Sequence, residues 1–294
     1  MKYNGFSPKP PIVRKALCEA VSFLGKLGIP HPRLEAEVLL AALLEEDRVK
    51  LLTYDERLLS LSLWEDYRSL LVKRAEGIPL QYLTGKQEFM SLTFQVNPSV
   101  LIPRADTEVL VEKVLSYRAD NSLPKSGSIV DVGTGSGAIA VSLAYYWPEA
   151  KITGVDISPE ALAVARENGA ANGVKVEWVL GDLLTPFIDS GVKFHLIVSN
   201  PPYIAAAEMP ELPRDVQREP ALALDGGPDG LAYYRRLIGQ APLCLTPNGI
   251  VAFEIGWDQG PAVKDLLAKA GFTQVQIGQD YAGRDRIVTA VFSG

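Results

Sequence analysis

The chain has few of the residue types that build metal centres. Its 294 residues include only two cysteines, Cys18 and Cys244, and two histidines, His31 and His195. These four residues lie in unrelated segments, and their spacing does not resemble a set of metal ligands. We therefore expect no metal site, and the chemistry of the protein must come from other groups.

Long apolar runs and a net positive charge are also missing. No apolar run approaches the roughly 20 residues that span a bilayer, and residues 1–11 lack an apolar signal core, so we expect a cytoplasmic protein with no membrane partner. A net charge of -6 argues against a protein that holds nucleic acid by broad phosphate neutralisation. Residues 1–85 carry 12 Lys and Arg against 11 Asp and Glu, so the total hides no basic domain.

The first 85 residues follow a helical pattern. At 294 residues the chain is about twice the length of a typical domain, so we expect two domains. Apolar residues three and four apart predict a first helix from Val13 to Leu27, and further helices are expected at 32–44, 49–53 and 63–76. In the last helix, Ser62 and Glu65 have capping-box spacing. Residues 1–85 are therefore predicted to form a small helical bundle that serves binding or docking.

The remainder of the chain is predicted to be an α/β domain. Residues 86–104 alternate between apolar and polar, which indicates a hairpin or an extended linker. A helix capped by Asp106 or Thr107 follows, and strands then alternate with helices through residues 105–294, as in a doubly wound, mostly parallel sheet. The last two strands, at 273–277 and 286–292, have no helix between them. They should pair antiparallel and reverse one strand at the sheet edge.

One rigid loop stands out in this domain. The apolar strand 194–198 runs directly into Ser199-Asn200-Pro201-Pro202-Tyr203. Two consecutive prolines cannot continue a central strand, so the chain leaves the sheet at this point. Because ligands bind outside the carboxyl ends of the strands in such sheets, Asn200 should present its amide at the rim of a site.

A glycine-rich loop follows the first predicted strand of the sheet. Gly133, Gly135 and Gly137 allow the backbone to turn tightly and to approach a ligand closely. Gly133, Gly135 and Ala138 also fit the dinucleotide fingerprint, and Asp156, at the end of the next strand, can bind ribose in either kind of cofactor. By themselves these residues leave the cofactor open.

Two further features favour a methyl donor over a nicotinamide. Gly181-Asp182 ends the third strand where an adenine ring should lie, and the Asn-Pro-Pro-Tyr stretch ends the fourth beside the reactive end of the cofactor. Hydride transfer has no evident need of an asparagine fixed by two prolines. An amide nitrogen is a poor nucleophile, but it can be oriented for methyl transfer if Asn200 and the carbonyl of Pro201 accept its N–H groups. Tyr203 should then pack on the planar substrate group.

The chain resembles a known family at this point. It looks like a class I S-adenosylmethionine-dependent methyltransferase, and specifically resembles the protein-(glutamine-N5) methyltransferases of peptide chain release factors, the PrmC/HemK family. The resemblance covers nearly the whole chain. Besides the helical domain, it rests on the segments 79–85, 88–89, 101–108, 131–139 and 198–204.

The resemblance implies a role for each matching residue. Gly133, Thr134, Gly135, Ser136 and Gly137 would line the methionine part of S-adenosyl-L-methionine, and Asp156 would bind its ribose. Asp182 and Leu183 would border the adenine. Asn200 would touch both donor and acceptor, and with Pro201, Pro202 and Tyr203 it would hold the glutamine of a Gly-Gly-Gln tripeptide in class 1 release factors. The family frequently has proline where this sequence has Ala105.

Two alternatives remain at this stage. The first is a nucleic-acid amino-methyltransferase acting on adenine N6 or guanine N2, since the Asn-Pro-Pro-Tyr stretch also occurs in such enzymes. The acidic balance and the lack of a basic, aromatic-rich segment in residues 1–85 argue against it and against stable binding of nucleic acid. The second is a non-catalytic scaffold that binds the cofactor. The intact Asn-Pro-Pro-Tyr stretch at 200–203 argues against this alternative.

Overall fold

The computed structural model describes residues 6–120 and 122–294 and divides the chain into two compact units. The helical unit consists of residues 1–85 and 213–218, and the α/β unit consists of residues 86–212 and 219–294. Within the described residues, none of the helices is both long enough and apolar enough to cross a membrane.

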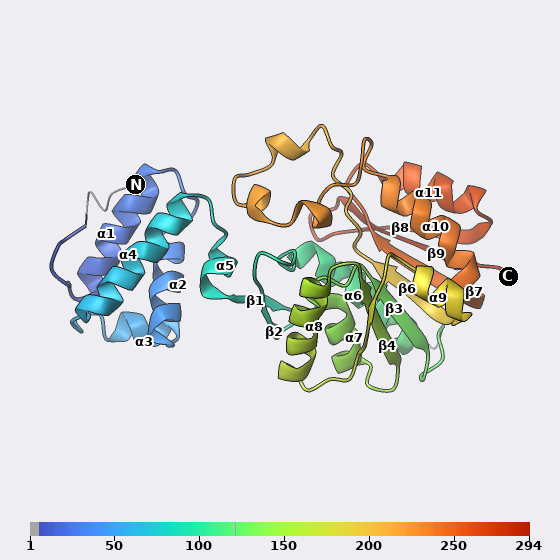
Figure 1. Ribbon diagram of the computed structural model, residues 1–294, viewed down its shortest axis with the longest axis horizontal. Helices are drawn as coiled ribbons and strands as arrows, with labels where there is room; N and C mark the ends of the chain where they lie inside the picture. Colours follow the sequence, from blue (N-terminus) through green and yellow to red (C-terminus); the bar gives the residue numbers. More distant parts are fainter. Residues whose placement is uncertain (1–5, 121) are drawn as a thin grey trace. The chain divides into compact units, whose positions relative to one another are not determined.

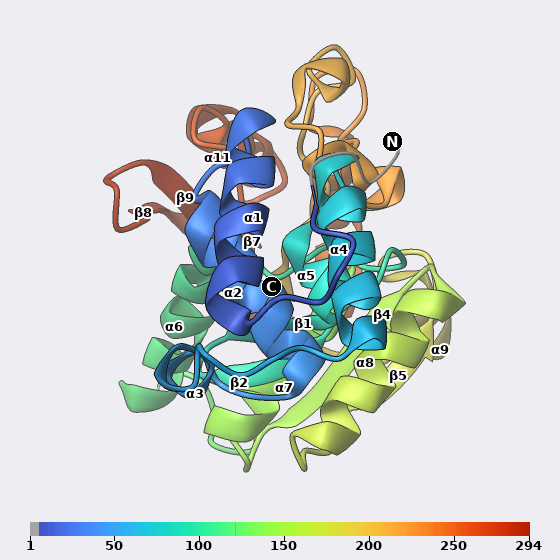
Figure 2. The ribbon, with the colours of Figure 1, turned by 90° about the vertical axis from the view of Figure 1, so that its left-hand side faces the viewer.

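The helical unit is built around an apolar core. Its helices are α1 (Val13–Lys26), α2 (Pro32–Leu44), α3 (Arg48–Thr53), α4 (Leu61–Ala75) and α5 (Leu80–Thr84). Helices α1, α2 and α4 lie side by side (Figure 2) and enclose the buried side chains of Leu24, Leu39 and Trp64.

One predicted helix start in this unit was wrong. Helix α4 begins at Leu61, and its cap is Ser60, whose hydroxyl oxygen accepts the backbone N–H of Leu63 at 3.2 Å. Ser62 lies inside the first turn. Ser60 can make the same cap two residues earlier, so the spacing of Ser62 and Glu65 was a coincidence.

A short segment from the second half of the sequence completes the helical unit. Arg74 and Glu35 are both buried, and Nε of Arg74 donates to Oε2 of Glu35 at 2.6 Å. The Arg74 guanidinium also pairs with Asp215 of the segment 213–218 at 3.4 Å. Residues 213–218 therefore belong to the helical unit, although their sequence shows neither a helical nor an apolar repeat.

Residues 86–95 form a hairpin that belongs to the α/β unit. Strands β1 (Lys86–Phe89) and β2 (Leu92–Gln95) pair antiparallel, and the two-residue turn places Met90 and Ser91 in left-handed conformations, as tight hairpin turns require. Phe89 and Phe94 are buried and meet edge to face, with ring centroids 6.0 Å apart. The hairpin thus contributes to the core of the α/β unit.

The main sheet has the predicted doubly wound architecture. Its seven strands have the order β5-β4-β3-β6-β7-β9-β8. Their bounds are β3 (Ser128–Val132), β4 (Lys151–Asp156), β5 (Glu177–Leu180), β6 (Phe194–Ser199), β7 (Leu245–Glu254), β8 (Phe272–Gln279) and β9 (Asp285–Phe292). Strand β9 runs opposite to the other six strands and pairs antiparallel with β7 and β8. The predicted antiparallel pair at the edge of the sheet, formed by β8 and β9, is confirmed.

Helices cover both faces of this sheet (Figure 1). Helices α7 (Ala138–Tyr146) and α8 (Pro159–Ala171) lie on one face, and α10 (Ala232–Cys244) and α11 (Gly260–Lys269) lie on the other. Two separate apolar cores result, one on each face. The unit also contains α6 (Ala105–Ala119) and the short 3-10 turns Met209–Glu211 and Ala221–Ala223. It contains a further helix, α9 (Thr185–Ser190), which the sequence analysis missed.

The start of α6 differs from the sequence prediction. Neither Asp106 nor Thr107 caps the helix, whose N-cap is Arg104 without a side-chain hydrogen bond. Asp106 pairs instead with Arg286 at 3.2 Å, and Thr107 is buried. Helix α8 does have a side-chain cap, since the hydroxyl oxygen of Ser158 accepts the backbone N–H of Ala161.

Candidate active site

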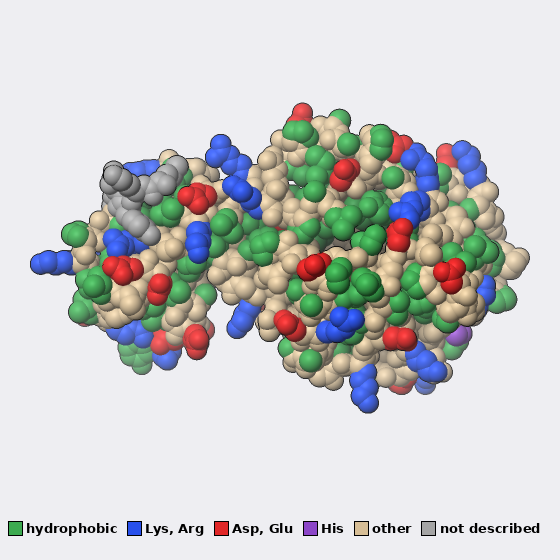
Figure 3. Space-filling view, viewed as in Figure 1, with side chains coloured by type: hydrophobic (Ala, Val, Ile, Leu, Met, Phe, Trp, Pro, Cys, Tyr) green, Lys and Arg blue, Asp and Glu red, His purple; other side chains and the backbone are tan. Residues whose placement is uncertain are grey.

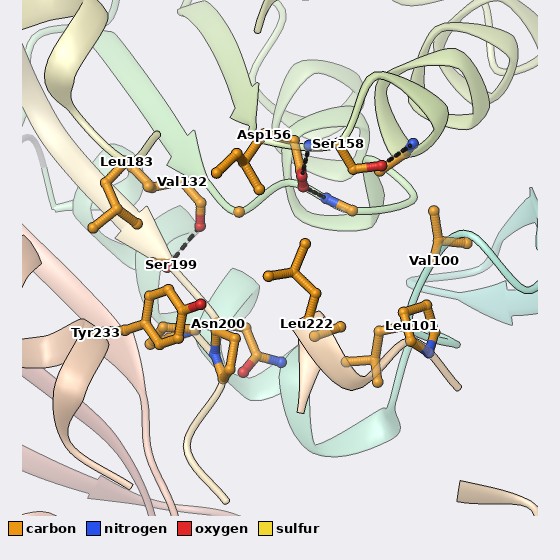
Figure 4. Close-up of a pocket in the computed structure, with 18 of the residues that line it drawn as sticks. Val100, Leu101, Val132, Asp156, Ser158, Leu183, Ser199, Asn200, Leu222 and Tyr233 are labelled. Atoms are coloured by element: carbon orange, nitrogen blue, oxygen red, sulfur yellow. Dashed lines mark hydrogen bonds between the residues drawn. The ribbon is translucent and has the colours of Figure 1, made fainter. Parts of the chain in front are cut away.

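A cavity of about 400 Å³ opens at the carboxyl ends of the parallel strands. It is lined by residues at or just after the ends of β3, β4, β5 and β6, including Gly133, Asp156, Asp182 and Asn200. Figure 4 shows Asp156 and Ser158 at one side of the cavity and Asn200 across from them. This is the position where doubly wound sheets bind ligands, and the volume suits a small molecule.

The glycine loop forms one wall of the cavity. Gly133 and Gly135 line it with positive φ angles of 71° and 55°, and a Cβ on Gly133 would project into open space. Thr134, Ser136 and Gly137 do not line the cavity. They shape the loop instead: the Thr134 hydroxyl donates to Asp131, the Ser136 carbonyl accepts from Asn168, and Gly137 lies against the ring of Trp178.

Asp131 holds the glycine loop from behind. Its side chain is fully buried, and Oδ2 accepts both the Thr134 hydroxyl at 2.6 Å and the Ala140 backbone N–H at 3.2 Å. The second bond ties the loop to the first turn of α7, where the helix dipole favours a negative group. Burial raises the pKa of Asp131 to about 7, although these two hydrogen bonds act in the opposite direction.

Asp156 presents a carboxyl group to the cavity in a fixed orientation. Its Oδ2 accepts the backbone N–H of Gly135 at 2.8 Å, and its Oδ1 accepts that of Ser158 at 2.9 Å. Burial raises the pKa of Asp156, and the backbone hydrogen bonds lower it. Each carboxylate oxygen can accept more than one hydrogen bond, so capacity remains for hydroxyl groups of a ligand.

The rest of the cavity wall combines apolar side chains with one ion pair. Asp182 and Leu183 line the cavity, and Asp182 pairs with Arg236 at 2.5 Å. Leu183 has a φ of 53°, a left-handed conformation that is costly for leucine and is found mainly at functional sites. Apolar lining residues that the sequence analysis did not single out are Val100, Leu101, Ile157, Leu222 and Tyr233. They come from four separate segments, and only the fold assembles them.

The Asn-Pro-Pro-Tyr stretch enters the same cavity. Asn200, Pro201 and Pro202 line it, and Nδ2 of Asn200 donates to Oγ1 of Thr107 at 3.2 Å. Tyr203 does not line it, because its hydroxyl is turned toward Oε1 of the buried Glu254 at 3.5 Å. Burial raises the pKa of Tyr203, and the charge of Glu254 raises it further. The sequence analysis did not single out Glu254, and it assigned Thr107 only a capping role.

The groups that line the cavity suit an organic cofactor. Within residues 6–120 and 122–294, no group of three or more His, Cys, Asp or Glu side chains could hold a metal ion. The glycine loop, the oriented carboxyl group and the apolar wall together suit a nucleoside with a polar tail. The sheet, the loop after β3 and the Asn-Pro-Pro-Tyr turn after β6 define a methyltransferase with a Rossmann-like fold.

Comparisons with known proteins give the family. Residues 15–85 match the PrmC N-terminal domain family, and residues 105–216 match the methyltransferase small domain family. The release factor glutamine methyltransferase of Moorella thermoacetica is 51% identical over 95% of this chain and 98% of its own length. That of Geobacter sulfurreducens is 42% identical over 95% and 97%. The chain belongs to the release factor glutamine methyltransferase family.

Solved structures share the fold of the α/β unit. A methyltransferase from Pyrococcus furiosus has a TM-score of 0.51 and 20% identity, covering 70% of this chain and 91% of the other. The 16S rRNA N2 G1207 methyltransferase of Thermus thermophilus has a TM-score of 0.52 and 18% identity, covering 70% and 49%. At these levels of sequence identity, the similarity shows a shared fold and nothing more.

Proposed function

We propose that this protein methylates the side-chain amide nitrogen of the glutamine in the Gly-Gly-Gln tripeptide of class 1 peptide chain release factors, with S-adenosyl-L-methionine as the methyl donor. One observation carries the proposal. Asn200 and Pro201, which suit a planar amide, line the same cavity as Gly133 and Asp156, which suit a nucleoside cofactor. The names of the relatives supply the substrate class.

Different cavity residues would contact the ribose, the methionine part and the adenine of the donor. Asp156 would accept hydrogen bonds from the ribose hydroxyls, and the glycine loop would lie along the methionine part. Asp182 and Leu183 would border the adenine, with Ile157 and Leu222 as apolar neighbours. When bound, S-adenosyl-L-methionine supplies an electrophilic methyl group on a positively charged sulfur.

The acceptor amide is activated by orientation. The lone pair of an amide nitrogen is delocalised into the carbonyl group, so the nitrogen attacks only if it is held in a reactive geometry. Oδ1 of Asn200 and the backbone carbonyl of Pro201 would each accept one N–H of the substrate glutamine. Groups fixed in this way can supply roughly 7–11 kcal/mol of barrier reduction.

The helical unit is assigned to recognition of the release factor. None of its described residues lines the cavity, and Figure 3 shows acidic and basic side chains interspersed on its visible face. A mixed surface suits a protein partner better than a nucleic acid, which selects for basic patches. We therefore place the enzyme in the cytoplasm, where release factors act, and assign it no stable nucleic-acid partner.

A side-by-side acceptor assay tests this function. The full-length protein is incubated with radiolabelled S-adenosyl-L-methionine and, separately, with a class 1 release factor, DNA or ribosomal RNA. Label should enter the release factor and should be absent from a release factor whose tripeptide glutamine is replaced by alanine. Label in DNA or RNA but not in the release factor would establish the nucleic-acid alternative instead. No label in any acceptor, with donor binding intact, would favour the scaffold.

A further inference from the structure

The backbone that leaves the Asn-Pro-Pro-Tyr turn is closely packed at Tyr203. Gly226 and Gly230, from the segment that precedes α10, both lie against the Tyr203 backbone. A Cβ on Gly226 would lie 2.8 Å from both the Cα and the carbonyl carbon of Tyr203, where it would overlap them. Glycine therefore allows two backbone segments to approach each other at the point where the turn ends.

A glutamine side chain holds the same point of the turn. Gln259, the N-cap residue of α11, donates from Nε2 to the Tyr203 carbonyl at 2.9 Å and to the Gly230 carbonyl at 3.3 Å. Its Oε1 accepts the backbone N–H of Gly256 at 3.0 Å. Backbone carbonyls can only accept and backbone N–H groups can only donate, so these three partners fix the orientation of the amide. A flipped amide would lose all three hydrogen bonds.

The turn itself is stiff between two fixed ends. Pro201 and Pro202 have locked φ angles, and a residue that precedes proline is held to extended conformations. One end is fixed in the sheet, where Ser199 pairs with β3 and β7 and its hydroxyl donates to the carbonyl of the last β3 residue at 2.6 Å (Figure 4). The other end is the Tyr203 carbonyl, which Gln259 holds. Prolines have no N–H to hold the turn themselves, so the contacts at Tyr203 keep it from pivoting about Ser199.

We propose that Gln259 is a positioning residue for methyl transfer, which fixes the Asn-Pro-Pro-Tyr turn through the Tyr203 carbonyl. This inference rests on the acceptor roles of Asn200 and the Pro201 carbonyl given above. Gln259 and Tyr203 do not line the cavity, so Gln259 acts on the acceptor only through the turn. The glycine loop and Asp156 belong to other strand ends, so donor binding should not depend on Gln259.

Backbone hydrogen bonds just beyond Tyr203 keep the segment folded when Gln259 is replaced. The N–H of Ile204 donates to the Leu224 carbonyl at 3.0 Å, and the Ile204 carbonyl accepts the N–H of Gly226 at 2.8 Å. Neither bond uses a side chain. A change at Gln259 should therefore loosen the turn at Tyr203 while this pairing remains.

The test is the substitution Gln259→Met, which keeps the length of the side chain and removes its donor and its acceptor. With a release factor as acceptor, kcat should fall about tenfold or more, since a displacement of about 1 Å can cost a hundredfold in rate. KM and the donor dissociation constant should stay within about threefold, because the groups that bind the donor are unchanged. Gln259→Glu keeps the acceptor for Gly256 but sets a carboxylate against two carbonyls, so it should lose at least as much kcat.

Asn172→Leu is the matched control. Like Gln259, Asn172 is half-buried, and its amide donates to two backbone carbonyls, those of Thr93 and Asn168, at 3.1 and 2.9 Å. None of these last three residues lines the cavity. Both substitutions should therefore lower the free energy of unfolding by similar amounts in urea titrations, but Asn172→Leu should keep kcat, KM and donor affinity near wild type.

Gly226→Ala moves the turn without removing the Gln259 side chain, and it carries the test if Gln259→Met does not fold. The added methyl group would press on the Tyr203 backbone, and Gly226 lies outside the left-handed region, so the effect is steric. We expect kcat to fall about tenfold or more with donor affinity within about threefold of wild type. A Cβ on Gly239 of α10 would meet nothing within 4 Å, so Gly239→Ala should leave both quantities near wild type.

The outcomes separate this inference from the proposed function. If the wild type methylates the release factor and folded Gln259→Met or Gly226→Ala has a wild-type kcat, only the positioning role is overturned. A loss confined to KM or donor binding, or an equal loss of kcat in Asn172→Leu, would also overturn it. A wild type that labels only nucleic acid would overturn the proposed function, and the same variants measured with that acceptor would decide the positioning role. Transfer to no acceptor would overturn both.

Discussion

Asp156 gives the sharpest test of the donor site. In Asp156→Ala the cavity loses a carboxyl group that two backbone N–H groups, those of Gly135 and Ser158, hold in place. Hydrogen bonds to a charged group contribute about 1.5–3 kcal/mol net, so affinity for S-adenosyl-L-methionine should fall roughly tenfold to a hundredfold. Calorimetric titration of the purified variant with the donor measures this directly.

Asp229→Ala is the matched control for that experiment. Asp229 also carries a carboxyl group, but it is about half exposed, pairs with Arg235 and does not line the cavity. Its removal should change donor affinity by no more than about threefold, since exposed ion pairs contribute little. Equal losses in the two variants, or an Asp156→Ala protein that binds the donor like wild type, would refute the ribose assignment. Binding of a nicotinamide dinucleotide in place of the methyl donor would refute the assignment of the whole loop.

Three further predictions concern stability. A Cβ on Gly154 would lie 2.6 Å from the Trp178 ring, so Gly154→Ala should lower the free energy of unfolding by about 1–3 kcal/mol in urea titrations, and an unchanged value would contradict this close packing. Arg74→Ala leaves the buried Glu35 without its guanidinium and should cost about 3–5 kcal/mol by the same assay, whereas a loss below 1 kcal/mol would show that the pair is dispensable. Burial raises the pKa of Asp131 above its value in the unfolded chain, so the free energy of unfolding of the wild type should fall as the pH rises from about 4 to about 7. Asp131→Asn should therefore gain stability relative to wild type over that pH range. A difference in unfolding free energy between the two proteins that does not change with pH would refute the shift.

The parts of the fold that follow from local sequence were predicted well. Strand β6 was expected at 194–198 and spans Phe194–Ser199, because a buried parallel strand is a continuous apolar run that ends where proline makes the chain leave the sheet. The position of Asn200 in a cavity follows from the same reasoning, since a doubly wound sheet places its loops at one edge.

The parts that depend on distant contacts were not predicted. The segment 213–218 joins the helical unit through Asp215 and Arg74, and a pairing over that separation leaves no local pattern. The same holds for Thr107, whose position three residues into a helix indicated a cap, while its burial depends on the neighbouring strand ends. The ring of Trp178 packs against Gly137, Gly154 and Gly169. The sequence around each glycine does not show that all three contact the same side chain.

The central claim is that Asn200 orients the acceptor amide during methyl transfer, and one pair of measurements tests it most directly. Single-turnover methylation of a release factor, followed by mass spectrometry of the Gly-Gly-Gln peptide, gives the transfer rate, and calorimetry gives donor affinity. Asn200→Ala should lower the rate by about a hundredfold or more, as expected when a group that stabilises the transition state is removed, while donor affinity stays within about tenfold of wild type. Asn200→Asp, which keeps an acceptor but adds a charge, should be partly active at best. A near-normal transfer rate in folded Asn200→Ala would contradict the account.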